Sequence, residues 1–439
     1  MRLRTLLLAL VWLGLGSDPV LAQDRDTKVR NDRKAFADSQ DWIYNNLAEG
    51  VRAARETHKP LMVVFRCIPC EACQEFDDDV ARRDPIIRDL LDQFVCVRIV
   101  QANTMDLTHF QFDFDLSLAV FFVDADLTIY GRFGTRSGRP EEQDISLEGL
   151  RKAMVEALRM HRNAAIVKPS LAGKQARPSR FQTPRDYPSL SGRYRAELDY
   201  AGSVARSCIH CHQIRDAERR LARSSGKRFS DEVLYPYPDP EVVGLKLNPR
   251  EMATIERVTA GSSADRDGFR PGDAIVALDG QPLLSIADLQ WVLHNAPATA
   301  KLPARVRRDG SLIDLTMTLN EGWRRGNISW RPTSWQLRQL GLGGMKLDDV
   351  KDEDRRQAKI PPDRMALKIA HVGEFGEHAV AKRAGLQRGD ILVSFDGIDR
   401  RMTESQLLDY TLRQKHRGDL VALTVLRDGM RKTLSYALP

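Results

Sequence analysis

Two nine-residue stretches decide the architecture of the C-terminal half of the chain: GDAIVALDG at residues 272–280 and GDILVSFDG at residues 389–397. Around each stretch the same three features recur in the same order: a Gly-apolar-Lys-Leu segment, an Ala-to-Gly segment, and an Arg-Asp-Gly turn between two β-forming runs. These features lie at 244–247 and 344–347, at 264–268 and 381–385, and at 308–310 and 427–429. Such ordered repetition indicates an internal duplication.

The duplicated pattern resembles the PDZ domains of bacterial envelope proteins. The resemblance implies that an extended peptide, often a C-terminus, adds as a strand to a sheet edge while backbone N–H groups of a Gly-apolar loop bind its carboxylate. By position, the peptide-binding residues are Gly244, Leu245, Lys246 and Leu247 in the first copy and Gly344, Met345, Lys346 and Leu347 in the second. We expect two such domains, 241–322 and 323–439, each a partly open β-barrel with helices. The alternative is that one or both copies only pack against a neighbouring domain.

The N-terminus has the composition of a cleaved leader. Arg2 and Arg4 precede an apolar run at residues 6–15, and small side chains follow up to Ala22, which predicts a signal peptide at 1–22. The alternative is a membrane anchor, but the run is shorter than the ~20 residues that a spanning helix needs. We therefore expect an exported protein of the periplasm, the cell envelope or the secreted fraction, without stable membrane insertion.

Residues 39–165 alternate between strand-like and helix-like segments, which predicts an α/β sheet. The expected strands are 61–65, 94–100, 119–123 and 127–133, and the last expected helix is 147–160. The first strand and the cysteines after it resemble the entry to a thioredoxin active site, so we interpret 39–165 as a thioredoxin-like domain.

Three cysteines follow that strand, at Cys67, Cys70 and Cys73. In thioredoxin-like chains the first active cysteine lies five residues after the last strand aromatic, which selects Cys70 as the attacking thiol and Cys73 as its resolving partner, with Cys67 as a third, regulating residue. A helix start would stabilise the Cys70 thiolate. Leu118 stands where redox thioredoxins have a cis-proline, so a structural or sensing disulfide on the same fold is the alternative.

A second cysteine motif, CIHCH, occupies residues 208–212. Cys208, Cys211 and His212 fit the attachment signature of c-type haem, in which two thiols bond the vinyl groups and the histidine binds iron. The alternatives are a zinc or copper ion held by the two cysteines and a neighbouring histidine, here His212, or a plain disulfide. The surrounding segment, 166–240, is rich in proline and basic residues, and we interpret it as a linker.

The chain has 439 residues and a formal net charge of +7, but no nucleic-acid motif accompanies its basic residues, so we expect no nucleic-acid partner. No Gly-x-Ser-x-Gly elbow precedes the duplication, which argues against a serine protease.

Taken together, the motifs resemble a family of thioredoxin-like/PDZ (seleno)proteins of planctomycete-type bacteria, some members of which carry selenocysteine in the thioredoxin-like centre. The resemblance implies a multidomain α/β and β-rich protein with a redox-active centre. We therefore predict an envelope thiol–disulfide and haem redox protein that recruits exported polypeptides, or their C-termini, through its PDZ domains and exchanges electrons with a redox partner protein. The alternative is a non-catalytic PDZ scaffold whose cysteines form structural disulfides or a metal site.

Overall fold

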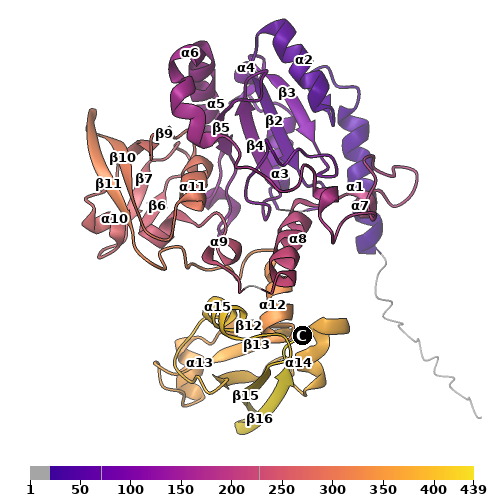
Figure 1. Ribbon diagram of the computed structural model, residues 1–439, viewed down its shortest axis with the longest axis vertical. Coiled ribbons are helices and arrows are strands. Elements are labelled where there is room, and N and C mark those ends of the chain that lie inside the picture. The colour runs from indigo at the N-terminus through magenta and orange to yellow at the C-terminus, as the bar shows by residue number, and fades with distance from the viewer. Residues whose placement is uncertain (1–19, 71, 227) are drawn as a thin grey trace, which may run out of the picture.

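The structure is a computed structural model that describes residues 20–70, 72–226 and 228–439 (Figure 1). Most of the predicted signal peptide, residues 1–19, lies outside the described residues. The first described element, α1 (Val20–Phe36), was not expected from the sequence. It packs beside α7 (Val204–Ser207), where Asp26 Oδ1 accepts the backbone N–H of Ala205 at 2.8 Å.

The N-terminal domain contains a five-stranded sheet of order β1-β3-β2-β4-β5. Its strands are β1 (Ile43–Tyr44), β2 (Leu61–Arg66), β3 (Val95–Ile99), β4 (Leu118–Val123) and β5 (Ile129–Phe133). β2 is parallel to β3 and antiparallel to β4, and every residue of β2 is buried. The predicted strands and the last helix, α5 (Leu147–Arg162), are therefore present, with ends within two residues of those expected.

Alternate side chains of β2 enter two different cores, as the period of a strand requires. Met62 and Val64 pack with residues of α3 (Gln74–Ala81), α4 (Arg88–Leu91) and α5. Val63 and Phe65 face the opposite side, where α2 (Leu47–Thr57) and the phenylalanines of residues 110–121 lie. Because both faces are covered, the strand reads as a continuous apolar run.

The segment 166–240, which we predicted to be a linker, instead packs against the thioredoxin-like domain. Tyr187, Ile209 and Ile214 belong to the same hydrophobic core as Val63 and Phe65. The regular elements of this segment are the end of α6 (Ala164–Val167), η2 (Lys168–Lys174), η3 (Pro184–Asp186), α7, α8 (Cys211–Ser224) and α9 (Asp231–Leu234). The apolar side chains of this segment are widely spaced among prolines and polar residues, so the sequence has no helix or strand period from which the packing could be predicted.

The first copy of the duplication contains a four-stranded sheet of order β11-β10-β8-β9 and a separate two-stranded sheet, β6-β7. The elements are η4 (Pro240–Val243), β6 (Leu245–Leu247), β7 (Ile255–Val258), α10 (Ser263–Arg266), β8 (Ala274–Leu278), β9 (Gln281–Pro282), α11 (Ile286–Asn295), β10 (Ala300–Arg308) and β11 (Ser311–Leu319).

The second copy forms one five-stranded sheet of order β12-β13-β14-β15-β16. Its elements are α12 (Ser334–Leu342), β12 (Met345–Asp349), α13 (Asp352–Gln357), β13 (Leu367–Val372), η5 (Gly376–Ala379), α14 (Val380–Arg383), β14 (Ile391–Phe395), α15 (Glu404–Gln414), β15 (Leu420–Arg427) and β16 (Met430–Ala437). Both copies therefore have open sheets, and the partly open barrels that we expected are not formed by the described strands.

An identical ion pair holds the motifs of each copy together. Arg308 donates to Asp273 through Nε and Nη2 at 2.7 Å, and Arg427 donates to Asp390 at 2.6 and 2.7 Å. In both copies the aspartate is buried and the arginine precedes the hairpin turn. The Gly-Asp and Arg-Asp-Gly motifs recur together because they form one bidentate contact.

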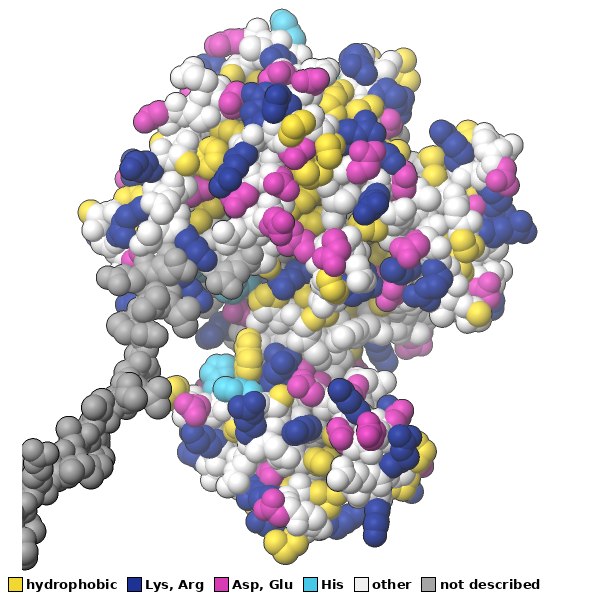
Figure 2. Space-filling model, turned by 180° about the vertical axis from the view of Figure 1, so that it is seen from behind, with side chains coloured by type: hydrophobic (Ala, Val, Ile, Leu, Met, Phe, Trp, Pro, Cys, Tyr) yellow, Lys and Arg dark blue, Asp and Glu magenta, His cyan; other side chains and the backbone are white. Residues whose placement is uncertain are grey.

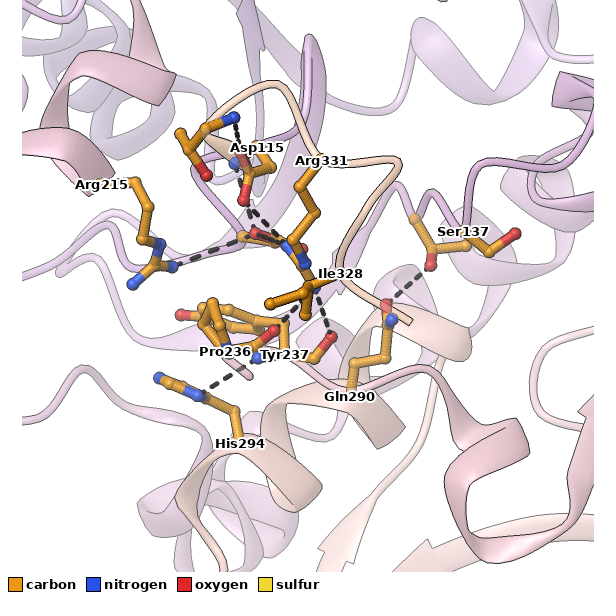
Figure 3. A network of polar contacts seen from close by, with 12 residues as sticks. Asp115, Ser137, Arg215, Pro236, Tyr237, Gln290, His294, Ile328 and Arg331 are labelled. Atoms are coloured by element: carbon orange, nitrogen blue, oxygen red, sulfur yellow. Dashed lines mark hydrogen bonds and ion pairs between the residues drawn. The ribbon is translucent and has the colours of Figure 1, made fainter. Parts of the chain in front are cut away.

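A buried polar junction joins the domains (Figure 3). Arg331, between the two copies, donates to Asp113 at 2.6 Å and to Asp115 at 3.0 Å in the thioredoxin-like domain, and to the backbone oxygens of Pro236 and Tyr237. Nearby, His294 of α11 accepts the backbone N–H of Tyr237 at 3.3 Å. The domains are therefore packed as one assembly around this arginine.

Basic and acidic side chains are interspersed over the face shown in Figure 2. Within the part of the chain that the structure describes, none of the helices is both long enough and apolar enough to cross a bilayer.

Candidate functional site

A tight cysteine turn follows β2. The backbone N–H of Cys70 donates to the carbonyl oxygen of Cys67 at 3.0 Å, and the two sulfur atoms lie 2.7 Å apart. Cys67 is buried and Cys70 is partly exposed. The structure therefore pairs Cys70 with Cys67, whereas the sequence led us to expect Cys73 as the partner.

Cys73 occupies a different position from the one expected. Helix α3 begins at Gln74, and Cys73 is its N-cap with a φ of 61°, so Cys70 lies in the turn before the helix and not at the helix start. The Cys73 side chain is buried, and burial raises its pKa. Its backbone N–H donates to Glu141 at 2.8 Å. Cys96, predicted to be a core thiol, is buried, and burial raises its pKa to about 12.

The two paired thiols have opposite pKa shifts. The hydrogen bond from Cys67 lowers the pKa of Cys70 to about 7, and the positive charge of Arg66 adds to the effect. The same hydrogen bond, together with burial, raises the pKa of Cys67 well above its ordinary value. The arrangement is a partly exposed, low-pKa thiol next to a buried, protonated one, which suits a nucleophile and its resolving partner.

Arg66, the last residue of β2, anchors this turn. Its guanidinium donates to the carbonyl oxygens of Cys67 at 2.5 Å and Cys70 at 2.9 Å, and its Nε lies 3.2 Å from Asp77 of α3. We did not single out this residue from the sequence. The available signal was a charged residue at the end of an otherwise apolar strand.

The second cysteine motif lies against the first. Nδ1 of His210 is 3.3 Å from the sulfur of Cys67, although the two residues are 143 positions apart. Hydrogen bonds of Ile209 hold the motif in place: its N–H donates to Asn103 Oδ1 at 2.6 Å and its carbonyl accepts the N–H of Ala102 at 3.2 Å. The histidine predicted as a ligand, His212, stacks on His210 with ring centroids 5.6 Å apart.

The room around this motif does not fit a haem. Cys67, Cys208, His210 and Cys211 line a cavity of about 10 Å³, enough for about one water molecule, whereas sites for organic ligands enclose ~300–1,000 Å³. Across the described residues, no three His, Cys, Asp or Glu side chains converge on a position for a metal ion. Haem, zinc and copper therefore remain predictions that this geometry does not favour.

The predicted peptide-binding loop of the first copy begins at Gly244, which has a φ of 92°. A Cβ there would lie 2.0 Å from the hydroxyl of Ser262. Helix α11 of this domain is largely buried, and it packs against both the thioredoxin-like domain and η2: Asp288 accepts the backbone N–H of Arg132 in β5 at 3.0 Å, and Trp291 Nε1 donates to the Gly173 carbonyl at 2.8 Å. In this copy the helix beside the expected groove serves as a packing surface.

In the second copy the predicted loop lies on the edge strand β12. Gly344 has a φ of 90°, and a Cβ there would lie 1.9 Å from the carbonyl oxygen of His378. The backbone N–H of Leu347 donates to Glu404 of α15 at 2.8 Å, and Arg338 of α12 holds the same carboxylate at 2.7 Å. Part of the strand edge is thus occupied by the protein's own side chains.

An open cleft of about 660 Å³ continues beyond that contact. It lies between the end of β12 and helix α15, and the segment between the two copies closes one side. Its lining includes Leu347, Asp349, Arg325, Thr403 and Tyr410.

Comparison with known families agrees with this architecture. The model of the thioredoxin-like family matches residues 42–125, and the PDZ family model matches twice, at 254–308 and 371–427. The chain combines a thioredoxin-like domain with two PDZ domains. The narrower resemblance to the planctomycete-type (seleno)proteins remains a prediction.

Curated relatives resemble only part of this thioredoxin-like/PDZ chain. A probable periplasmic serine endoprotease, DegP-like, of Pseudomonas savastanoi pv. phaseolicola is 24% identical over 190 residues, which is 42% of this chain and 37% of that protein. A serine protease, HtrA-like, of Staphylococcus epidermidis is 25% identical over 173 residues, 38% of this chain and 26% of that protein. The chain thus spans about a third of the length of these relatives. Among solved structures, the PDZ domain of EpsC from Vibrio cholerae is 21% identical and covers 22% of this chain and 95% of its own, with a TM-score of 0.16.

Proposed function

We propose that this protein exchanges disulfides with polypeptides, using Cys70 as the attacking thiol and Cys67 as the resolving thiol. The observation that carries the proposal is the 2.7 Å contact between the two sulfurs, with the pKa of Cys70 lowered to about 7 and that of Cys67 raised. A thiol with a pKa near the ambient pH is the best attacking group in thiol–disulfide exchange.

The reaction needs only these two sulfurs and the substrate. The Cys70 thiolate attacks a substrate disulfide, which breaks and releases one substrate sulfur as a thiolate while a mixed disulfide forms. Cys67 then gives up its proton and attacks the Cys70 sulfur, releasing the second substrate thiol. The substrate disulfide is reduced to two thiols, and the enzyme dithiol is oxidised to a Cys67–Cys70 disulfide.

The second PDZ domain is the proposed capture site for the polypeptide. Its cleft of about 660 Å³ lies beside the edge strand β12, so an extended chain can add to that edge beyond Leu347. The first PDZ domain acts mainly in packing, because its helix α11 is buried against the thioredoxin-like domain. The predicted leader and the relatives named as periplasmic support a location in the bacterial envelope.

The exchange reaction is tested by insulin reduction with the mature chain. We expect activity in the wild type, its loss in Cys70→Ser and Cys67→Ser, and its retention in Cys73→Ser, since the sulfur of Cys70 contacts that of Cys67 while Cys73 caps helix α3. Equal rates for the wild type and Cys70→Ser would show that the protein is not an exchange enzyme and would favour the scaffold alternative.

Capture is tested by calorimetry with reduced, carboxymethylated α-lactalbumin, a permanently unfolded polypeptide. Tyr410→Ala alters the cleft and should weaken binding. Leu420→Ala removes an exposed side chain of β15 that does not line the cleft, and it should bind like the wild type. Equal affinities for the wild type and Tyr410→Ala would remove the cleft from the account.

A further inference from the structure

The second cysteine motif lies next to the first pair. Cys208 is 5% exposed, Cys211 is partly exposed, and both line the same small cavity as Cys67. The contact between His210 and Cys67 fixes the two motifs relative to each other. A substrate protein therefore reaches the partly exposed Cys70 far more easily than Cys208, whereas Cys67 is next to both motifs.

The surroundings of the two pairs differ in how they stabilise a thiolate. Burial raises the pKa of Cys208 and of Cys211 to about 12, and the nearby Cys70 sulfur adds to both shifts. Cys70 has the opposite shift. A dithiol whose thiolate is stabilised is the more oxidising couple, because its reduced form is favoured. Because a substrate reaches the partly exposed Cys70 first and Cys67 lines the same cavity as the second pair, electrons should pass from the second pair to the first, and the pKa shifts favour the same direction.

We propose that Cys208 and Cys211 form an internal dithiol that reduces the Cys67–Cys70 disulfide. This inference rests on the proposed exchange function and deepens it. It would give one chain four reducing equivalents instead of two, so that two substrate disulfides are reduced before an external reductant is needed.

The internal step balances without any other reactant. A thiolate from the second motif attacks the Cys67 sulfur of the Cys67–Cys70 disulfide, and Cys70 departs as the thiolate, because the thiol with the lower pKa is the better leaving group. The other thiol of the second motif then attacks the mixed disulfide. Cys67 leaves, and a Cys208–Cys211 disulfide forms. Of the two protons lost by Cys208 and Cys211, one ends on the sulfur of Cys67, and the other is divided between Cys70 and the solvent because the pKa of Cys70 is about 7.

The test follows the position of the disulfide after a single turnover. The fully reduced chain reacts anaerobically with one equivalent of oxidised glutathione, is quenched with N-ethylmaleimide and is mapped by mass spectrometry. In the wild type we expect the disulfide at Cys208–Cys211, with Cys67 and Cys70 alkylated. In the Cys208→Ser/Cys211→Ser variant we expect it to stay at Cys67–Cys70. Cys96→Ser, which removes an isolated core thiol, is the matched control and should behave like the wild type.

With excess oxidised glutathione, the wild type should reduce two equivalents per chain and the double variant one. A first turnover in the double variant equal to that of the wild type shows that it is folded and that the exchange function holds. A wild-type disulfide that remains at Cys67–Cys70 would then overturn the relay alone. Loss of the first turnover in the wild type would overturn both proposals. The relay would also be overturned if the wild type bound one zinc ion per chain and the double variant bound none, because Cys208 and Cys211 would then be metal ligands.

Discussion

Replacing Cys67 by alanine should raise the pKa of Cys70 from about 7 toward the ordinary thiol value of 9.0, because the hydrogen bond from Cys67 is the largest cause of the shift. At pH 7 about half of the Cys70 side chains are ionised in the wild type, against about 1% at a pKa of 9, so the thiolate fraction falls about 50-fold. Each remaining thiolate is more nucleophilic, by about 6- to 10-fold over two pKa units for a Brønsted slope of about 0.4–0.5. The net expectation is a reaction at pH 7 that is roughly five- to eightfold slower.

The assay is the rate of Cys70 alkylation by iodoacetamide between pH 5 and pH 10, followed on the Cys70 peptide by mass spectrometry. The wild-type profile should have its midpoint near pH 7, and Cys67→Ala should move the midpoint upward by one to two units. Cys67→Ser is the matched control, because its hydroxyl can still donate to the Cys70 sulfur, and its midpoint should lie between the other two. If Cys67→Ala titrates at the same pH as the wild type, the Cys67 contact is not what activates Cys70.

Three further predictions concern the scaffold. In Gly344→Ala the second PDZ domain should unfold at a lower urea concentration than in Gly389→Ala. Both glycines have a φ of 90–96°, so either alanine costs about 1–3 kcal/mol of backbone strain. Of the two, it is at Gly344 that the new Cβ would also meet a backbone oxygen, at 1.9 Å. Arg331→Met should lower the free energy of unfolding by ~3–5 kcal/mol, since it removes the arginine that donates to two buried carboxylates and leaves them with the weaker contacts of Arg215 and the Thr333 N–H. Arg305→Gln, in an exposed ion pair, should leave the Tm unchanged, and equal Tm values for the two variants would refute the role of the junction. His294 is buried among arginines. Burial is the larger cause and the positive charge of the arginines the smaller one, and together they lower the pKa of His294 well below 6.5. Below pH 6.5 the unfolded state therefore binds more protons at this residue, which contributes about 1.4 kcal/mol of lost stability per pH unit as the pH drops. His210 and His212, whose pKa values are also lowered by burial, add to the slope, so His294→Asn, which keeps an acceptor for the Tyr237 N–H, should reduce the slope in urea unfolding curves by that contribution and leave the rest.

Most of the fold was predictable because its elements have strong local signals. The apolar run of β2 and the repeated Gly-Asp and Asp-Gly turns mark buried strands and hairpins whatever the rest of the chain does. Helix α1 was missed because it follows directly on the predicted leader, and its place in the fold is set by tertiary contacts, among them those with α7 and with Arg98.

The site was predictable only in its residue types. The sequence places a cysteine three residues on either side of Cys70, and spacing alone does not decide between Cys67 and Cys73. The choice follows from tertiary contacts: Arg66 binds both carbonyls of the 67–70 turn, and the helix starts only after Cys73. The approach of His210 to Cys67 spans 143 positions and has no local signal at all.

Helix α8 connects the cysteine centre with the second PDZ domain, and Figure 1 shows this helix between the thioredoxin-like domain and the second PDZ domain. It starts at Cys211, and near its other end Arg219 donates to the Thr333 carbonyl and Arg223 to the Pro439 carbonyl, both at 3.0 Å. Its 14 residues span about 21 Å, and an extended polypeptide covers about 3.3 Å per residue. An extended polypeptide that runs alongside the helix would cover its length in about six to seven residues. Because the helix starts at the cysteine centre and contacts residues of the second PDZ domain, capture would raise the local concentration near Cys70 of disulfides in the parts of the polypeptide that flank the bound segment.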